Sequence, residues 1–194
     1  MNESYSYWTF GDVFEETGVP FSLFHGGFGM VANGCIPKPT LWTFKFYKNL
    51  KKFGTDCAYR SDNAVIMRKK GGGWCGVAWN FGLNGRNNDL ELNVLFDAPD
   101  GEYSFIMYTT DTLTCNPLKV WHDIGEPKTP TEAQLDIIRS ASYPFVSTER
   151  LSVSEGRLSS KIKVRDCGVV YFEFTPSEID GDRGYDYKRV SEVR

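Results

Sequence analysis

The hydrophobic pattern of this chain changes from a helical to an alternating period at Gly54, and that change divides the fold. Between Pro39 and Phe53, apolar residues recur every three to four positions, which predicts an amphipathic helix with a wide apolar face. Pro39 suits the first turn because its missing N–H has no partner there. Gly54 is predicted to end the helix as a C′ residue. Beyond Gly54, apolar and polar residues alternate as they do in half-buried strands.

Eight short segments beyond Gly54 have the alternation and composition of β-strands. They are residues 57–60, 64–69, 74–80, 90–96, 103–110, 150–154, 158–164 and 169–174. Turn sequences such as Asn84-Gly85 and Glu155-Gly156 separate them. Many short strands with such turns predict an antiparallel β-sandwich. One helix interrupts the strands, with Thr129-Pro130-Thr131-Glu132 as a capping box that places proline at N1.

The residues before the helix have the order of a barrel unit. An aromatic strand is predicted over residues 4–10, followed by a glycine-rich loop over 11–34 that carries carboxylates and a histidine. Strand, loop and helix in this order form one unit of a (β/α)8 barrel, where the loop after the strand holds the chemistry. We therefore predict a mainly β chain in three parts. Residues 1–54 are a β/α unit of a TIM barrel, 55–176 an antiparallel β-sandwich with its inserted helix, and 177–194 a polar tail.

Composition argues against several kinds of partner and site. A net charge of -3 argues against nucleic acid, and no apolar run approaches the roughly 20 residues of a membrane span. Without a visible leader we expect a cytoplasmic location. Five cysteines without CxxC spacing predict no metal site and free thiols, although Cys57 and Cys75 could pair if their strands are neighbours. The glycine run 26–29 lacks a phosphate-loop pattern.

Several gapped motifs resemble one enzyme family. Tyr7-Trp8-Thr9-Phe10, Phe14-Glu15-Glu16, Phe24-His25-Gly26-Gly27-Phe28-Gly29 and Ile36-Pro37-Lys38-Pro39 resemble the eighth barrel strand, loop and helix of family 39 of the glycoside hydrolases. That family contains β-xylosidases and α-L-iduronidases. Downstream, Val77-Ala78-Trp79-Asn80 is similar to a strand of the family's C-terminal β-domain. A spaced pattern around a short helix also matches, at Asn116, Trp121, Gly125, Pro127, Pro130 and Gln134. The resemblance covers residues 4–176, and it implies that residues 1–54 are the last β/α unit of the barrel and that residues 55–176 are the accessory domain.

The resemblance implies an enzyme that uses no cofactor and whose catalytic residues lie outside this chain. Glycoside hydrolysis uses two carboxyl groups about 5 to 9.5 Å apart on either side of the scissile bond. Glu15 and Glu16 are adjacent on a loop, so their side chains point away from each other. The resemblance places the acid/base and nucleophile glutamates on the fourth and seventh barrel strands, which this chain lacks. We therefore predict no catalytic residue here and no hydrolysis by the chain alone.

Three residues are candidates for sugar binding. The resemblance implies that Trp8 lines the subsite of the cleaved sugar and that Glu16 accepts hydrogen bonds from sugar hydroxyls. An indole face packs on a pyranose ring, and a carboxylate accepts strong hydrogen bonds. Trp8 could instead be a core aromatic residue, and Glu16 a solvent-facing charge. His25 could touch substrate or orient the loop, whereas Asp12 and Glu15 are expected to accept backbone N–H groups.

The function expected from these features is that of a C-terminal fragment of a retaining, β-xylosidase-like enzyme, inactive alone. The alternative is a non-catalytic carbohydrate-binding or interaction module, and a third possibility is a degenerate product without activity. The expected partners are a xylose-containing glycoside and the missing barrel portion. The apolar face of the 39–53 helix either folds back on the sandwich or is buried by self-association.

Overall fold

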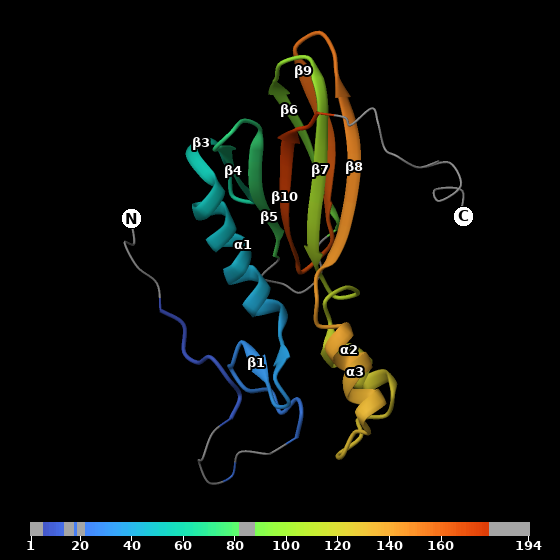
Figure 1. Cartoon of the computed structure of the whole chain (residues 1–194). Helices are drawn as coiled ribbons and strands as arrows, with labels where there is room; N and C mark the ends of the chain where they lie inside the picture. The colour runs from blue at the N-terminus through green and yellow to red at the C-terminus, as the bar shows by residue number, and fades with distance from the viewer. Residues whose placement is uncertain (1–5, 14–17, 19–21, 82–87, 179–194) are drawn as a thin grey trace, which may run out of the picture.

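The computed structural model describes residues 6–13, 18, 22–81 and 88–178, and these form a mainly β structure (Figure 1). The strands are β1 (Val31–Ala32), β2 (Ile36–Pro37), β3 (Gly54–Arg60), β4 (Ala64–Lys69), β5 (Trp74–Asn80), β6 (Leu90–Asp97), β7 (Gly101–Thr110), β8 (Phe145–Val153), β9 (Arg157–Val164) and β10 (Gly168–Pro176). The helices are α1 (Pro39–Phe53), α2 (Pro117–Asp123) and α3 (Glu132–Ser140). All eight predicted strands after Gly54 are present, and those at 64–69 and 74–80 have the predicted bounds.

Two antiparallel sheets share the main hydrophobic core. The larger sheet has the strand order β3-β4-β5-β10-β7-β8, and β6 pairs with β9 in the smaller one. Ala78, Phe172 and Phe174 of the larger sheet belong to the same buried cluster as Leu158 and Ile162 of β9. Successive side chains on a strand point to opposite faces, so these residues leave their neighbours Val77 and Tyr171 on the other face of the larger sheet. That second face needs its own cover.

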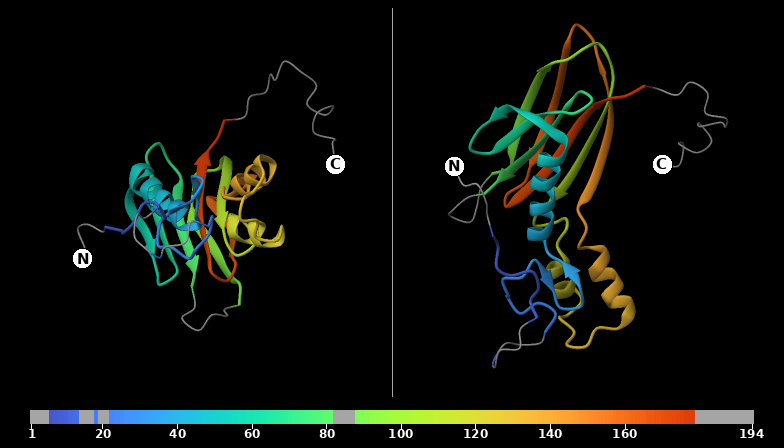
Figure 2. Two further views of the ribbon diagram at one scale, coloured as in Figure 1. Left: turned by 90° about the horizontal axis from the view of Figure 1, so that it is seen from below. Right: turned by 60° about the vertical axis from the view of Figure 1, so that its left-hand side comes forward.

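Helix α1 supplies that cover. Its buried side chains Trp42, Phe46 and Leu50 form a second cluster with Val77 and Tyr171 of the larger sheet. Figures 1 and 2 show α1 lying along the side of the sheet that carries β3, β4 and β5. Of the two alternatives for its apolar face, the structure therefore shows packing on the sheet. Self-association is not needed to bury this stripe.

Gly54 ends α1 for a different reason from the predicted one. Its φ of -74° is an ordinary value, not the left-handed conformation of a C′ glycine. A Cβ atom at this position would lie 2.6 Å from the carbonyl oxygen of Leu50 and 2.8 Å from Cβ of Met67. The glycine is required because the helix end and β4 approach too closely for a side chain.

The helical region between β7 and β8 also differs from the prediction. Helix α2 was not predicted as a separate element, although Asn116 caps it and Pro117 opens it. Seven residues are too few for a clear helical period, so these end signals were the only local indication. The capping box of α3 lies two residues later than predicted, formed by Thr131 and Gln134. The side chain of Thr131 accepts from the N–H of Gln134 at 3.3 Å.

The predicted aromatic strand at residues 4–10 is not formed in its described part, residues 6–10. One parallel bridge joins Gly11 to Val31, and the N–H of Val31 donates to the carbonyl of Phe10 at 2.9 Å. A strand needs neighbours on which to form a ladder, and only this short contact is available to it here. Residues 4 and 5 lie outside the described part of the chain.

The N-terminal segment is nevertheless anchored to the rest of the chain. Leu23, Ala32 and Ile36 form a third buried cluster with Trp121 of α2 and Ile138 of α3. Below the larger sheet as drawn in Figure 1, β1 lies on one side and α2 and α3 on the other. The loop before α1 is thus held by a small core of its own.

The five cysteines are all free. Cys57 of β3 and Cys75 of β5 both pair with Met67 of β4, so a whole strand lies between them. Two strand spacings separate their Cα atoms by about 10 Å, beyond the roughly 7 Å that a disulfide can bridge. The possible Cys57–Cys75 disulfide is therefore excluded.

Within the described residues, no helix has both the length and the apolar character needed to cross a bilayer. Ser177 still donates its N–H to the carbonyl of Glu102 at 2.8 Å. Residues 179–194 lie outside the described part, so the polar tail and the three part boundaries stay predictions.

Candidate functional site

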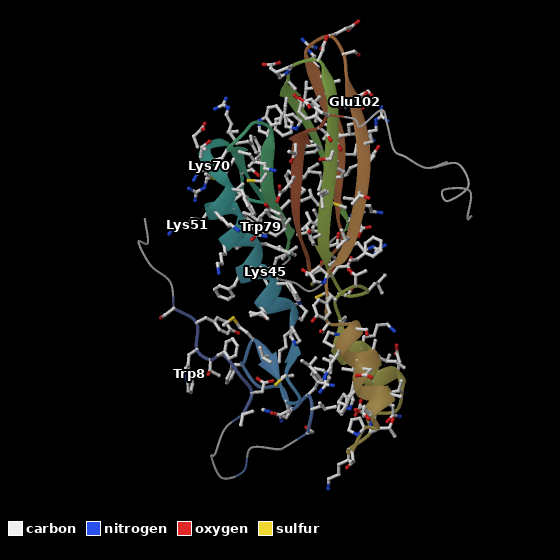
Figure 3. The ribbon with its side chains drawn as sticks, viewed as in Figure 1. Trp8, Lys45, Lys51, Lys70, Trp79 and Glu102 are labelled. Carbon is white, nitrogen blue, oxygen red and sulfur yellow. The ribbon has the colours of Figure 1, made fainter. Side chains whose placement is uncertain are left out.

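Large apolar side chains are exposed on the N-terminal segment. Trp8 is 74% exposed, Phe10 66%, Val13 73% and Phe28 69%. Figure 3 shows Trp8 on this segment, away from the two sheets. Single exposed apolar residues are ordinary, but four on one short segment mark a surface that is suited to a ligand or to another part of a protein.

Tyr7 fixes the backbone next to Trp8. Its hydroxyl donates to the carbonyl oxygen of Phe28 at 2.9 Å, and its ring meets Phe44 of α1 edge-on, with 5.4 Å between centroids. The N–H of Met30 donates to the carbonyl of Thr9 at 3.2 Å. Trp8 therefore lies between two residues that are tied to the loop and to the helix.

A buried carboxylate organises the loop that follows. Asp12 is 1% exposed, and its Oδ1 accepts the N–H of Gly29 at 2.7 Å. Its Oδ2 lies 2.5 Å from Nζ of Lys38 but accepts no hydrogen bond of good geometry from the described residues, so this contact is an ion pair. Lys38 also donates to the carbonyl of Gly27 at 2.8 Å. Asp12 thus accepts a backbone N–H, as the sequence predicted.

Two glycines of the 26–29 run are required by this carboxylate. A Cβ atom on Gly27 would lie 2.6 Å from Oδ1 of Asp12. A Cβ atom on Gly29 would lie 2.5 Å from the carbonyl carbon of Gly11 and 2.6 Å from the same Oδ1. The glycine run therefore allows close approach to Asp12, which is a structural role.

His25 is joined to the same centre. Its ring is half-buried, and its Nε2 lies 3.0 Å from the backbone carbonyl oxygen of Asp12. The structure thus places two of the three predicted sugar-binding residues, Trp8 and His25, on a segment held together around Asp12. Glu16 lies outside the described residues.

The chemistry available among the described residues is limited. Asp12 is buried and ion-paired, which leaves it unsuited to proton transfer with a ligand. No group of three His, Cys, Asp or Glu residues with metal-binding geometry occurs in the described ranges. Burial raises the pKa of Cys75 to about 11 and that of Cys115 to about 12, so both remain protonated thiols.

One cavity at this end of the molecule had no signal in the sequence. It has a volume of about 610 Å³ and is lined by the N-terminal loop, the start of α1, the turn after β7, the start of α2 and the start of β10. Its lining includes Gly26, Lys38, Thr43, Asp111, Leu118 and Val169. These residues are far apart in the chain, so only the tertiary fold brings them together.

Comparison with known proteins gives the class to which this chain belongs. The family model for glycosyl hydrolases family 39 matches residues 1–159. A β-xylosidase of Geobacillus stearothermophilus is 35% identical over 172 residues, which are 88% of this chain and 33% of that protein. A β-xylosidase of Caldicellulosiruptor saccharolyticus is 28% identical over 151 residues, 71% of this chain and 29% of that protein.

Solved structures agree with the sequence relatives. The GH39 enzyme from Xanthomonas axonopodis pv. citri superposes with a TM-score of 0.75 at 26% identity, over 89% of this chain and 37% of that one. A monomeric β-xylosidase from Caulobacter crescentus CB15 gives 0.73 at 23% identity, over 90% and 38%, and shares the fold. The chain is thus a glycoside hydrolase relative. It belongs to family 39, and it spans about a third of the length of the curated relatives.

Proposed function

We propose that this chain is the C-terminal part of a retaining, β-xylosidase-like enzyme. In this proposal, residues 1–54 are the last barrel unit and supply one wall of the sugar site. The two sheets form the accessory β-sandwich. The exposed side chains of Trp8, Phe10, Val13 and Phe28 carry the proposal, because they belong to a segment that forms no strand in the described residues 6–10. The coverage of about a third of the relatives' length supports it.

The proposed wall binds sugar through its predicted residues. The indole of Trp8 packs on a pyranose face, while Glu16 and His25 exchange hydrogen bonds with hydroxyls. A retaining mechanism needs two carboxyl groups about 5 to 5.5 Å apart across the scissile bond. Asp12 is buried in an ion pair with Lys38, and Glu15 and Glu16 are adjacent in sequence. The chain therefore binds sugar without hydrolysing it.

Hydrolysis of a nitrophenyl β-xyloside tests the proposal. The purified chain is expected to release no nitrophenol. Mixing it with the N-terminal two-thirds of the Geobacillus β-xylosidase is expected to restore turnover, because that portion supplies the missing barrel. Trp8→Ala in this chain is expected to lower the restored rate without loss of the fold, whereas Lys51→Ala, a substitution on the exposed face of α1, serves as the control.

Two outcomes would contradict the proposal. Turnover by the chain alone would show that it carries its own catalytic pair. Strong retention on xylan, unaffected by Trp8→Ala and without any restored turnover, would favour a non-catalytic binding module.

A further inference from the structure

We propose that the Asp12–Lys38 ion pair holds His25 in one tautomer, so that Nδ1 of His25 is an open acceptor for a sugar hydroxyl. The inference rests on the proposed function of the N-terminal segment as a wall of a sugar site. Asp12 and Lys38 are positioning residues in this arrangement, since they act through His25 and do not touch the sugar.

Asp12 connects both ends of the loop. Its N–H donates to the carbonyl of Val31 at 2.9 Å, and its own carbonyl contacts His25 Nε2 at 3.0 Å. Its side chain holds Gly29 through Oδ1. A carboxylate buried to this degree is costly without a counter-charge, and Lys38 provides one at 2.5 Å. Removing either charge therefore loosens the backbone that His25 contacts.

The contact to Asp12 decides which ring nitrogen of His25 carries the proton. A backbone carbonyl oxygen only accepts, so in the neutral imidazole Nε2 must be the N–H donor and Nδ1 keeps its lone pair. Among the described residues, Nδ1 has no hydrogen-bond partner. The ring is also packed against the loop backbone, because a Cβ atom on Gly27 would lie 2.7 Å from Cε1 of His25. Nδ1 is thus a fixed acceptor on a half-buried ring.

The tautomer can be read directly by nuclear magnetic resonance. The chain has only two histidines, and His122→Gln assigns the signals in a long-range nitrogen–proton spectrum of the imidazoles. The wild-type chain is expected to show His25 as the Nε2–H tautomer. Asp12→Asn and Lys38→Met are expected to give a mixture of tautomers, and Lys38→Arg to restore the single one. A wild-type mixture, an Nδ1–H tautomer, or unchanged spectra in both charge-removing variants would show that the Asp12–Lys38 ion pair does not fix the tautomer of His25.

A titration with β-1,4-xylobiose tests sugar binding by His25 separately from the control of its tautomer by Asp12 and Lys38. His25→Gln keeps a donor for the carbonyl of Asp12 but has no ring Nδ1. It is expected to weaken xylobiose binding about threefold to tenfold, the value of one neutral hydrogen bond. A single Nε2–H tautomer together with no xylobiose binding by the wild-type chain would refute the proposed sugar wall. Xylobiose binding unaffected by His25→Gln would refute the acceptor role alone.

Discussion

At the scale of single residues, backbone conformation and close approach explain several residue choices. Cys35, Cys115, Glu126, Glu155 and Cys167 have positive φ, which residues other than glycine, asparagine and aspartate adopt at a cost. Gly27 and Gly29, by contrast, are required because Asp12 lies against them. Substitution can relieve backbone strain at a residue with positive φ, whereas any side chain at Gly27 or Gly29 would collide with Asp12.

Glu155 is the clearest case for a stabilising substitution. Its φ is 60° and that of Gly156 is 73°, between strands β8 and β9. Two left-handed residues in a two-residue hairpin turn favour the sequence Asn-Gly. Glu155→Asn is expected to stabilise the chain by about 0.5 to 1 kcal/mol, measured by urea unfolding. Gly156→Ala, at the adjacent position, should destabilise it, and an unchanged midpoint in both variants would contradict this account.

At the scale of elements, α1 stabilises the fold by covering the second face of the larger sheet. Phe46 is 2% exposed, and its ring stacks with Tyr171 at 5.9 Å between centroids. Lys48 on the opposite side is exposed. The helix therefore works as a third layer, and its stability depends on the stripe of Trp42, Phe46 and Leu50.

Phe46→Ala tests this packing. The loss of a fully buried aromatic side chain is expected to cost about 3 to 5 kcal/mol in the free energy of unfolding. Lys48→Ala, on the exposed face of the same helix, should change it by less than about 0.5 kcal/mol. Similar urea midpoints for the two variants would mean that α1 is not docked on the sheet in solution.

At the scale of the whole molecule, the layers decide which thiols are accessible. Cys75 and Cys115 are buried in the cluster beneath α1, whereas Cys35, Cys57 and Cys167 are exposed. Burial raises the pKa values of Cys75 and Cys115, and burial together with Asp166 raises that of Cys167. A raised pKa leaves less thiolate at a given pH, so these groups react more slowly with iodoacetamide.

Alkylation of the native chain at pH 8 is expected to label Cys35 and Cys57 first and Cys167 more slowly. Cys75 and Cys115 should be labelled only after denaturation, as mass spectrometry of the peptides will show. Rapid labelling of Cys75 in the native chain would indicate that α1 leaves the sheet.

The elements that depend on local pattern could be predicted from the amino-acid sequence alone. The period change at Gly54, the bounds of α1 and the eight strands after it follow from side chains within a few positions of one another. The resemblance in residues 7–39 likewise indicated the family that the comparisons show.

Contacts between segments that are distant in the chain could not be predicted and are known from the folded structure. Strand order placed β4 between Cys57 and Cys75, and the larger sheet packs against the apolar stripe of α1. The ion pair of Asp12 and Lys38 required the loop to close on itself. The aromatic segment at 6–10 has the propensity of a strand but lacks a ladder, because hydrogen-bond partners are a property of neighbours in space and not of local sequence.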